Sequence, residues 1–198
     1  MINRYTRAVG RKIVLFEWLR PSTLRSLTSN SQEDYFLRLN VPRSFDIQPD
    51  DLKSSYRQLM AKLHPDRHTL KPTKEQDEVG QKAAKVTHAY QVLRQPHQRA
   101  MHLLELINSP LEEEDSGGLV GFDFLEEVME LREEICNAEE NEDEVQLKEI
   151  SKSNQACVDI LYAELATAFK TENTKTALKL TAKLQYRNRI NETIRDIL

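Results

Sequence analysis

Residues 49–93 read PDDLKSSYRQLMAKLHPDRHTLKPTKEQDEVGQKAAKVTHAYQVL, and this stretch decides the fold of the first half of the chain. Pro49 suits the first position of a helix, and the two aspartates after it lie at the positive end of the helix dipole. Pro65 cannot continue that helix, because it lacks a backbone N–H and disfavours helical geometry at His64. We therefore expect a helix that ends at His64, a polar loop that includes Pro72, and a second helix.

Each helix of this pair carries one narrow apolar stripe when its residues are placed at intervals of about 100°. The stripes contain Leu52, Tyr56, Leu59 and Leu63 in the first helix and Val79, Ala83, Val86, Tyr90 and Leu93 in the second. Two such stripes bury each other when the helices form an antiparallel hairpin. A short helix over residues 34–40, N-capped by Asp34, and another from Pro96 would complete a first domain of residues 33–108.

Three longer amphipathic segments follow at residues 121–137, 142–169 and 174–197. Their short connections predict a three-helix bundle over residues 121–198, since each apolar stripe needs the other two for burial. Residues 109–120 combine four consecutive acidic residues with two glycines, which indicates an acidic, flexible linker. For part of this segment the alternative is the acidic first turn of a helix. The expected fold is all-α, with an N-terminal helical hairpin, flanking short helices and a C-terminal bundle.

The composition of the 198 residues excludes several classes of protein. With 39% hydrophobic and 30% charged residues and only five glycines, it is typical of charged, amphipathic helices. Charge interrupts every apolar run before the roughly 20 residues that a membrane span needs, so we expect no membrane partner. The net charge of −4 divides into +5 for residues 1–32, +2 for 33–108 and −11 for 109–198. Because the folded part is not basic, we expect no nucleic-acid partner.

The first 32 residues form a basic arm, with six basic side chains against Glu17 alone. The arm is rich in Arg, Ser and Thr, and apolar residues from Ile13 to Trp18 lie between its charges. This composition is typical of mitochondrial targeting segments, so residues 1–32 are expected to direct the chain to the mitochondrial matrix. The alternative is an ordered basic helix packed on the body of the protein.

The residues that could support catalysis or metal binding are few. Cys136 and Cys157 cannot supply a four-ligand zinc site, and their helical positions predict reduced, buried thiols. His64, Asp66 and His68 could be read as metal ligands, but Pro65 and the small number of converging donors argue against it. No nucleophile with an accompanying base is recognisable. We expect no enzymatic activity, no metal and no cofactor.

The triplet His64-Pro65-Asp66 is expected at the tip of the hairpin, where proline stiffens the turn and the carboxylate can meet a basic partner group. Its context consists of Asp34-Tyr35-Phe36, Tyr56-Arg57 and Ala89-Tyr90-Gln91-Val92-Leu93. Together these residues resemble the J-domain family, the co-chaperones of the seventy-kilodalton heat-shock chaperones. The resemblance implies that the hairpin tip stimulates ATP hydrolysis by the ATPase domain of such a chaperone.

A basic face of the first long helix leads to this tip. Lys53, Arg57, Met60 and His64 share a stripe about 100° from the apolar one. The cations of this stripe favour electrostatic docking of the chaperone. The candidate chaperone-binding residues are His64, Pro65, Asp66, Lys53, Arg57, Lys62 and Arg67. Lys62 lies on the other side of the apolar stripe from Lys53 and Arg57, and Arg67 lies in the loop. Both are therefore secondary candidates. The alternative for these charges is a solvated helix face.

A narrower resemblance comes from two further segments. Leu93-Arg94-Gln95-Pro96-His97-Gln98-Arg99-Ala100 and Phe124-Leu125-Glu126-Glu127-Val128-Met129-Glu130-Leu131-Arg132-Glu133-Glu134-Ile135 look like HscB-type J-proteins. The similarity covers residues 34–197. It implies delivery of the iron-sulfur cluster assembly scaffold to a dedicated heat-shock chaperone, in the mitochondrial matrix for eukaryotic members. The paired cysteines of the zinc module that animal members often carry are missing from residues 1–33, and Thr87 stands where the family commonly has Asn.

The expected scaffold-binding face lies on the bundle. Leu125, Met129 and Cys136 form a second apolar stripe on the first bundle helix, which a small bundle does not need for its own core. By resemblance, the scaffold-binding residues are Leu125, Met129, Glu130, Glu133, Asn137 and Tyr186. An aromatic side chain among aliphatic neighbours is a typical interface hot spot. The alternative is that Leu125 and Met129 pack against the first domain.

The sequence therefore predicts a non-enzymatic adaptor with two partners, a mitochondrial heat-shock chaperone and the iron-sulfur scaffold. One alternative is a J-protein with another client, in preprotein import or general folding. Another is a helical interaction protein that has no effect on any chaperone. These readings differ in whether the chain stimulates ATP hydrolysis and in which protein it binds most strongly.

Overall fold

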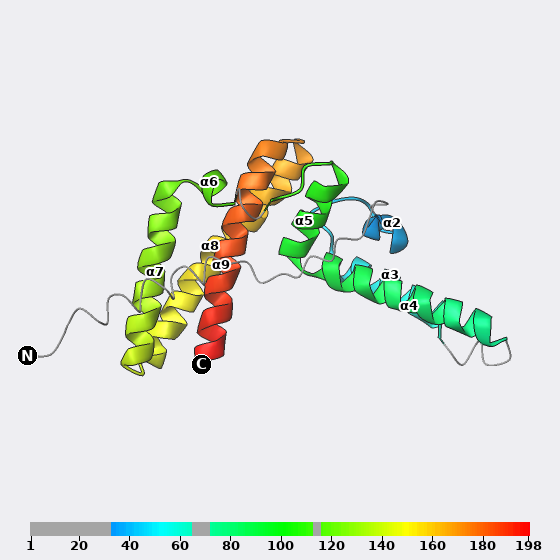
Figure 1. Cartoon of the computed structure of the whole chain (residues 1–198), viewed down its shortest axis with the longest axis horizontal. Coiled ribbons are helices and arrows are strands. Elements are labelled where there is room, and N and C mark those ends of the chain that lie inside the picture. Colours follow the sequence, from blue (N-terminus) through cyan, green and yellow to red (C-terminus); the bar gives the residue numbers. More distant parts are fainter. Residues whose placement is uncertain (1–32, 65–71, 113–115) are drawn as a thin grey trace, which may run out of the picture. The chain divides into compact units, whose positions relative to one another are not determined.

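The first short helix begins where the sequence provides an N-cap. The computed structural model describes residues 33–64, 72–112 and 116–198 (Figure 1). The Asp34 carboxylate accepts hydrogen bonds from the backbone N–H groups of Phe36 and Leu37, at 2.9 and 3.2 Å, and so starts α2 (Tyr35–Arg38). Phe36 is fully buried, which anchors this helix to the core.

The expected hairpin is confirmed, with α3 (Pro49–Lys62) packed against α4 (Thr73–Arg94) (Figure 1). Tyr56 stacks on Tyr90 with 4.3 Å between ring centroids, and the Thr87 hydroxyl lies 3.9 Å from the sulfur of Met60. These contacts pair rising numbers on α3 with falling numbers on α4, so the helices are antiparallel. Ala89, which lies beside the expected stripe, is fully buried because it faces the helices that cover the hairpin.

Helix α5 (Pro96–Leu106) covers one side of the hairpin and turns three apolar residues inward, whereas Ile107, at its C-cap, is exposed. The buried residues are Ala100, Leu103 and Leu104. Its His102 is also buried, with its ring 4.1 Å from that of Tyr35, and its Nε2 accepts the Tyr35 backbone N–H at 3.2 Å. Helix α2 is thereby tied to α5.

The three bundle segments form α7 (Phe122–Glu140), α8 (Glu144–Lys170) and α9 (Thr174–Ile197), which pack against one another. The connection between α7 and α8 and the one between α8 and α9 each contain a glutamate in the left-handed region, Glu142 and Glu172. Asp143 and Asn173 then cap the next helix with their side chains. The described residues hold eight helices and no strand, which confirms the all-α fold.

The segment expected to be a flexible linker, residues 109–120, is partly helical and partly buried. Ser116–Val120 form α6, which packs against α9, and Leu111 and Val120 are almost fully buried. These apolar side chains on either side of the acidic run reach the core, whereas residues 113–115 lie outside the described residues. The acidic composition predicted a linker for the whole segment, although both of its ends are packed against the protein.

One hydrophobic core cluster joins the hairpin to the bundle. The described residues from 33 onward form one compact unit, and its larger cluster contains Phe36 and Leu93 together with Leu165 and Leu184. A smaller cluster at the other end of the bundle is built from Ile135, Ala138, Leu147, Ile150, Ile190 and Ile194. The first domain is therefore packed on the bundle through apolar side chains.

The sequence also gave expectations for the two cysteines, the basic arm and membrane spans. Cys136 and Cys157 are unpaired, but the expected burial is wrong, since Cys136 is exposed and Cys157 half-buried at the edges of the helix stripes. The basic arm of residues 1–32 lies outside the described residues. No helix in the described part of the chain is long and apolar enough to cross a membrane.

Candidate functional site

The end of α3 carries the first residue of the proposed chaperone-binding tip. The backbone N–H of Leu63 still donates to the carbonyls of Leu59 and Met60, both at 3.1 Å, and His64 follows as an exposed residue. Pro65, Asp66 and Arg67 lie outside the described residues, so their expected roles remain predictions.

The basic face of α3 is exposed as the sequence predicts. Lys53, Arg57 and Lys62 are all exposed, whereas Leu52, on the side that faces α4, is buried. Lys53 also lines a cavity of about 400 Å³, together with Asp50, Arg94 and Arg99. The sequence analysis missed these two arginines. They stand on either side of the break between α4 and α5, where Pro96 begins the new helix.

The proposed scaffold-binding face is accessible on α7. Met129 is 46% exposed, Glu130, Glu133 and Asn137 are exposed, and Leu125 is half-buried at the edge of the core. The alternative that Leu125 and Met129 are both sealed against the first domain is therefore wrong for Met129.

Tyr186 of α9 lies next to this face. Its ring meets that of Phe124 edge-on, with centroids 6.1 Å apart, and Phe124 directly precedes Leu125. A Cβ at Gly117 of α6 would lie 3.9 Å from the Tyr186 hydroxyl. Tyr186 is therefore half-buried, with contacts to α6 and α7.

A polar network that the sequence analysis missed holds α7 and α8 against α9. The buried Arg187 forms an ion pair with Glu127 and donates to the Asn154 side chain at 3.3 Å. Asn154, which is also buried, donates to the Arg187 carbonyl at 2.9 Å and to the Asn191 side chain at 2.7 Å.

Two cations of α9 lie over an aromatic ring of α7. Lys183 and Arg187 are 4.9 and 5.4 Å from the centroid of the Phe124 ring. The available signal was that Arg187 falls in the apolar stripe of α9.

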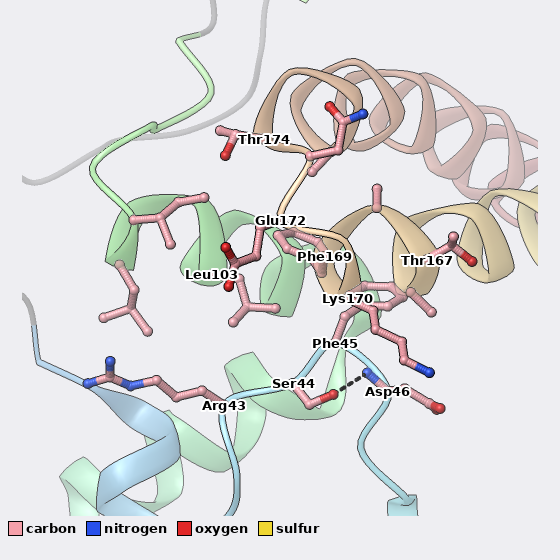
Figure 2. A pocket seen from close by; sticks show the side chains of 16 residues that line it. Arg43, Ser44, Phe45, Asp46, Leu103, Thr167, Phe169, Lys170, Glu172 and Thr174 are labelled. Carbon is pink, nitrogen blue, oxygen red and sulfur yellow. Dashed lines mark hydrogen bonds between the residues drawn. The ribbon is translucent and has the colours of Figure 1, made fainter.

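A cavity of about 980 Å³ lies where the loop before α3 meets α5 and the α8–α9 turn (Figure 2). The view shows Arg43, Phe45 and Asp46 on the loop side and Phe169 and Lys170 on the α8 side. Ser44 accepts the backbone N–H of Asp46 at 3.2 Å, which shapes the loop at the mouth of the cavity. Both halves of the chain therefore contribute to one concave surface.

Burial lowers the pKa values of two groups on α5. Burial and the nearby Arg189 lower the pKa of His97 to about 4, and the His97 Nε2 is buried without a hydrogen-bond partner among the described residues. Burial also lowers the pKa of Arg99, whose guanidinium donates to the Leu93 carbonyl at 2.8 Å and to the Phe45 carbonyl. The Arg99 hydrogen bonds connect α5 to the end of α4 and to the loop before α3.

At α2, opposing effects set the pKa of Asp34. Burial raises the pKa of this carboxylate, but hydrogen bonds from Leu37 N–H and Arg43 outweigh burial and hold the pKa below its usual value. The Arg43 Nε lies 2.5 Å from the carboxylate. Asp34 is therefore a structural cap. Among residues 33–64, 72–112 and 116–198, no three His, Cys, Asp or Glu side chains lie close enough together to hold a metal ion.

Two protein families match the two halves of the chain. The DnaJ domain matches residues 34–102, which include α2 to most of α5. The family described as the HSCB C-terminal oligomerisation domain matches residues 122–195, which include α7 to α9. The hairpin with its covering helices is thus a J-domain, and it is followed by the helical domain of one particular group of J-proteins.

Several curated proteins share both domains with this chain. The "Co-chaperone protein HscB" of Proteus mirabilis is 30% identical over 162 residues, which cover 81% of this chain and 93% of that protein. The "Iron-sulfur cluster co-chaperone protein HscB homolog" of Arabidopsis thaliana is 30% identical over 161 residues, 81% of this chain and 62% of the plant protein. The chain belongs to the HscB co-chaperone family.

Solved structures of this family have the same fold. The crystal structure of the human co-chaperone protein HscB is similar with a TM-score of 0.76 and 27% identity, over 89% of this chain and 88% of that chain. The chaperone HscB from Vibrio cholerae is similar with a TM-score of 0.72 and 25% identity, over 83% of this chain and 97% of that chain. Both similarities cover the J-domain and the bundle together.

Proposed function

We propose that this protein delivers the iron-sulfur cluster assembly scaffold to a seventy-kilodalton heat-shock chaperone and stimulates ATP hydrolysis by that chaperone. The observation that carries the proposal is the union, in one compact unit, of a J-domain bearing His64-Pro65-Asp66 and an HscB-type bundle with an exposed apolar face on α7. The protein itself is not an enzyme in this proposal, since its task is to bring two partners together.

The chaperone side of the proposal rests on the exposed charges of α3. Lys53 and Arg57 stand on the solvent side of the helix whose last turn leads to His64. Cations on a rigid helix steer an acidic partner surface and increase its association rate. Asp66 then supplies a carboxylate for a basic group of the ATPase domain. Lys62, which is exposed on the other flank of α3, and Arg67 are secondary candidates for the same docking.

The scaffold side of the proposal rests on Leu125, Met129 and Tyr186. An apolar side chain as exposed as Met129 gains free energy when a partner covers it. Tyr186 is held against Phe124, so that little rotamer entropy is lost when a partner packs on it. Glu130, Glu133 and Asn137 offer polar contacts at the rim of the apolar face.

A separation-of-function experiment tests both sides. Asp66→Ala should abolish stimulation of the chaperone ATPase and leave scaffold affinity unchanged, with the exposed Asp77→Ala on α4 as the matched control. The triple variant Leu125→Ala, Met129→Ala, Tyr186→Ala should do the reverse. The measurements are steady-state ATP hydrolysis by the purified chaperone and titration calorimetry with the purified scaffold. A triple variant that binds the scaffold with wild-type affinity contradicts the proposed face.

The identity of the client can be tested independently of the chosen variants. Pull-down from mitochondrial matrix extract should recover the iron-sulfur scaffold as the dominant bound protein. Recovery of unfolded or imported precursor proteins instead favours a J-protein for general folding or preprotein import. The protein alone should hydrolyse no ATP.

The proposed location is the mitochondrial matrix, which the basic composition of residues 1–32 supports. A fluorescent protein fused behind residues 1–32 should accumulate in mitochondria. The matched control replaces Arg4, Arg7, Arg11 and Lys12 by Gln, which should leave the fusion in the cytosol. A wild-type fusion that stays in the cytosol contradicts this location.

A further inference from the structure

We infer that Phe122 is a further anchor for the iron-sulfur scaffold, one helical turn N-terminal to Leu125, and that the scaffold meets this ring with an apolar recess edged by basic side chains. The inference rests on the proposed function, because it takes the scaffold as the partner of this face. Phe122 was not among the residues that the sequence resemblance marked for scaffold binding.

The exposure of Phe122 is the first observation. At 77%, it has the largest exposed fraction of any large apolar side chain in the described part of the chain. A lone exposed apolar residue needs no explanation, but Phe122 is not alone on its face. Met129, with 46% exposure, lies seven residues further along the same helix. Residues seven apart are separated by only about 20° around a helix, so the two side chains share one side of α7.

The core of the bundle uses a different side of α7 from the one that carries Phe122 and Met129. Phe124, Val128 and Ile135 are buried and face the bundle. The stripe of Phe122, Leu125 and Met129 lies beside that core side, with spacings of three and four residues. Leu125 is half-buried between the two. The core therefore takes the first group and leaves Phe122 and Met129 available to a partner.

The start of α7 fixes the position of this ring. Gly121 has φ of 85°, a backbone conformation that residues with a Cβ rarely adopt, and it is the residue between α6 and α7. Val120, on its other side, is buried and so fixes the end of α6. Phe122 is thus the first residue of a helix whose entry is determined by a buried anchor and a glycine turn.

The charges beside the stripe indicate what kind of surface can cover it. Glu126, Glu130 and Glu133 are exposed and lie on the side of α7 away from the core, next to Phe122 and Met129. A partner with acidic groups there would meet like charges, whereas Lys or Arg at its edge would be attracted. The scaffold surface that covers the stripe is therefore apolar at its centre and basic along one edge.

Removal of the ring should weaken scaffold binding without affecting the fold. Aromatic side chains dominate the binding energy of many interfaces, so we expect Phe122→Ala to raise the Kd for the scaffold at least about tenfold. Phe122→Leu, which keeps part of the apolar surface, should raise it less. The matched control is Ile160→Ala, which truncates another exposed apolar residue, 60% exposed, on α8, and should leave the Kd unchanged.

The experiment is titration calorimetry of the full chain with the purified scaffold, in low and in physiological salt. The inference is supported if Phe122→Ala raises the Kd for the scaffold tenfold or more while Ile160→Ala leaves it unchanged. The Kd of the wild-type protein should also rise with salt. A Phe122→Ala variant that binds within twofold of wild type overturns it and leaves the proposed function standing. Wild-type protein that binds no scaffold overturns the proposed function and the inference with it.

Sedimentation of the protein alone tests a second copy of the chain as the occupant. The expected result is the same sedimentation for wild type and Phe122→Ala. If wild type is a dimer and Phe122→Ala a monomer, with the scaffold Kd unchanged, the face belongs to self-association and the inference is overturned. Wild type and Phe122→Ala should have the same circular dichroism spectrum and, without scaffold, the same stimulation of the chaperone ATPase. The reason is that Phe122 is largely exposed and lies outside the J-domain.

Discussion

Phe45 and Phe169 stack with their ring centroids 5.6 Å apart and their planes at 21°. Phe45 belongs to the loop before α3, within the J-domain, and Phe169 to the end of α8, within the bundle. The Arg99 guanidinium lies 5.6 Å from the Phe45 centroid and donates to the Phe45 carbonyl. One aromatic residue therefore connects the J-domain, through α5, to the domain that is proposed to hold the scaffold.

The first prediction is that Phe45→Ala destabilises the whole unit. Phe45 is 5% exposed, and truncation of a buried phenylalanine usually costs about 3 to 5 kcal/mol, because apolar contacts are lost and a cavity remains. The free energy of unfolding, measured in urea, should fall by roughly 3 kcal/mol. Leu37→Ala is the control, since Leu37 is 72% exposed. Equal and small effects of both changes would show that Phe45 does not join the domains.

The second prediction concerns the network around Arg187. Asn154→Ala removes one acceptor for the Arg187 guanidinium and one donor to the Arg187 carbonyl, so two buried hydrogen bonds are lost. We expect a loss of about 1 to 3 kcal/mol in the free energy of unfolding. The exposed neighbour Ser153 provides the control variant Ser153→Ala, which should change it by less than about 0.5 kcal/mol. Wild-type stability of Asn154→Ala would mean that water replaces the amide.

The sequence predicted the helices because their apolar residues recur with helical spacing. The stripe of α8 was predicted as Leu147, Ile150, Val158, Leu161, Leu165 and Ala168, and all six are buried. Periodicity does not reveal contacts between residues far apart in the chain. Phe45 therefore went unnoticed, since it lies in a loop and its partner Phe169 is more than a hundred residues away.

The exposure of the candidate site residues was predicted in part, for a similar reason. The exposed Lys53, Arg57 and Met129 lie where their helical positions place them. Periodicity cannot tell whether a half-apolar position is covered by a neighbouring helix, and so Cys136 was expected inside but is exposed. The same limit concealed Arg187, a cation that is buried because Glu127 and Asn154 satisfy part of its guanidinium.

The third prediction is that the charges of α3 act on the rate of chaperone association. The double variant Lys53→Gln, Arg57→Gln should lower that rate at low ionic strength by roughly tenfold, because steering by complementary charge is lost. The difference from wild type should shrink as salt is added, since screening weakens exposed charges. Stopped-flow binding to the chaperone ATPase domain measures it. Lys152→Gln, on α8, is the control, and an equal effect from this change would indicate net charge alone.

The fourth prediction is that His97 makes the stability of the unit depend on pH. Burial, assisted by the charge of Arg189, lowers the pKa of His97 to about 4 from the ordinary 6.5. Between these values the unfolded chain binds a proton that the folded chain does not, so the free energy of unfolding falls as the pH falls. At about 1.4 kcal/mol per pKa unit, acidification from pH 7.5 to 5.5 should cost wild type roughly 1 kcal/mol through this group.

His97→Gln should remove this part of the pH dependence, because glutamine does not titrate. The comparison is made above pH 5.5, since Asp34 and Glu33, whose pKa values are held below their usual values against the opposing effect of burial, remain charged there. Urea unfolding at pH 7.5 and 5.5 gives the difference between the two proteins. NMR titration gives the cause, as the His97 ring signals should stay unchanged until the pH approaches 4. A His97 midpoint near 6.5 would mean that water reaches the ring between α5 and α9.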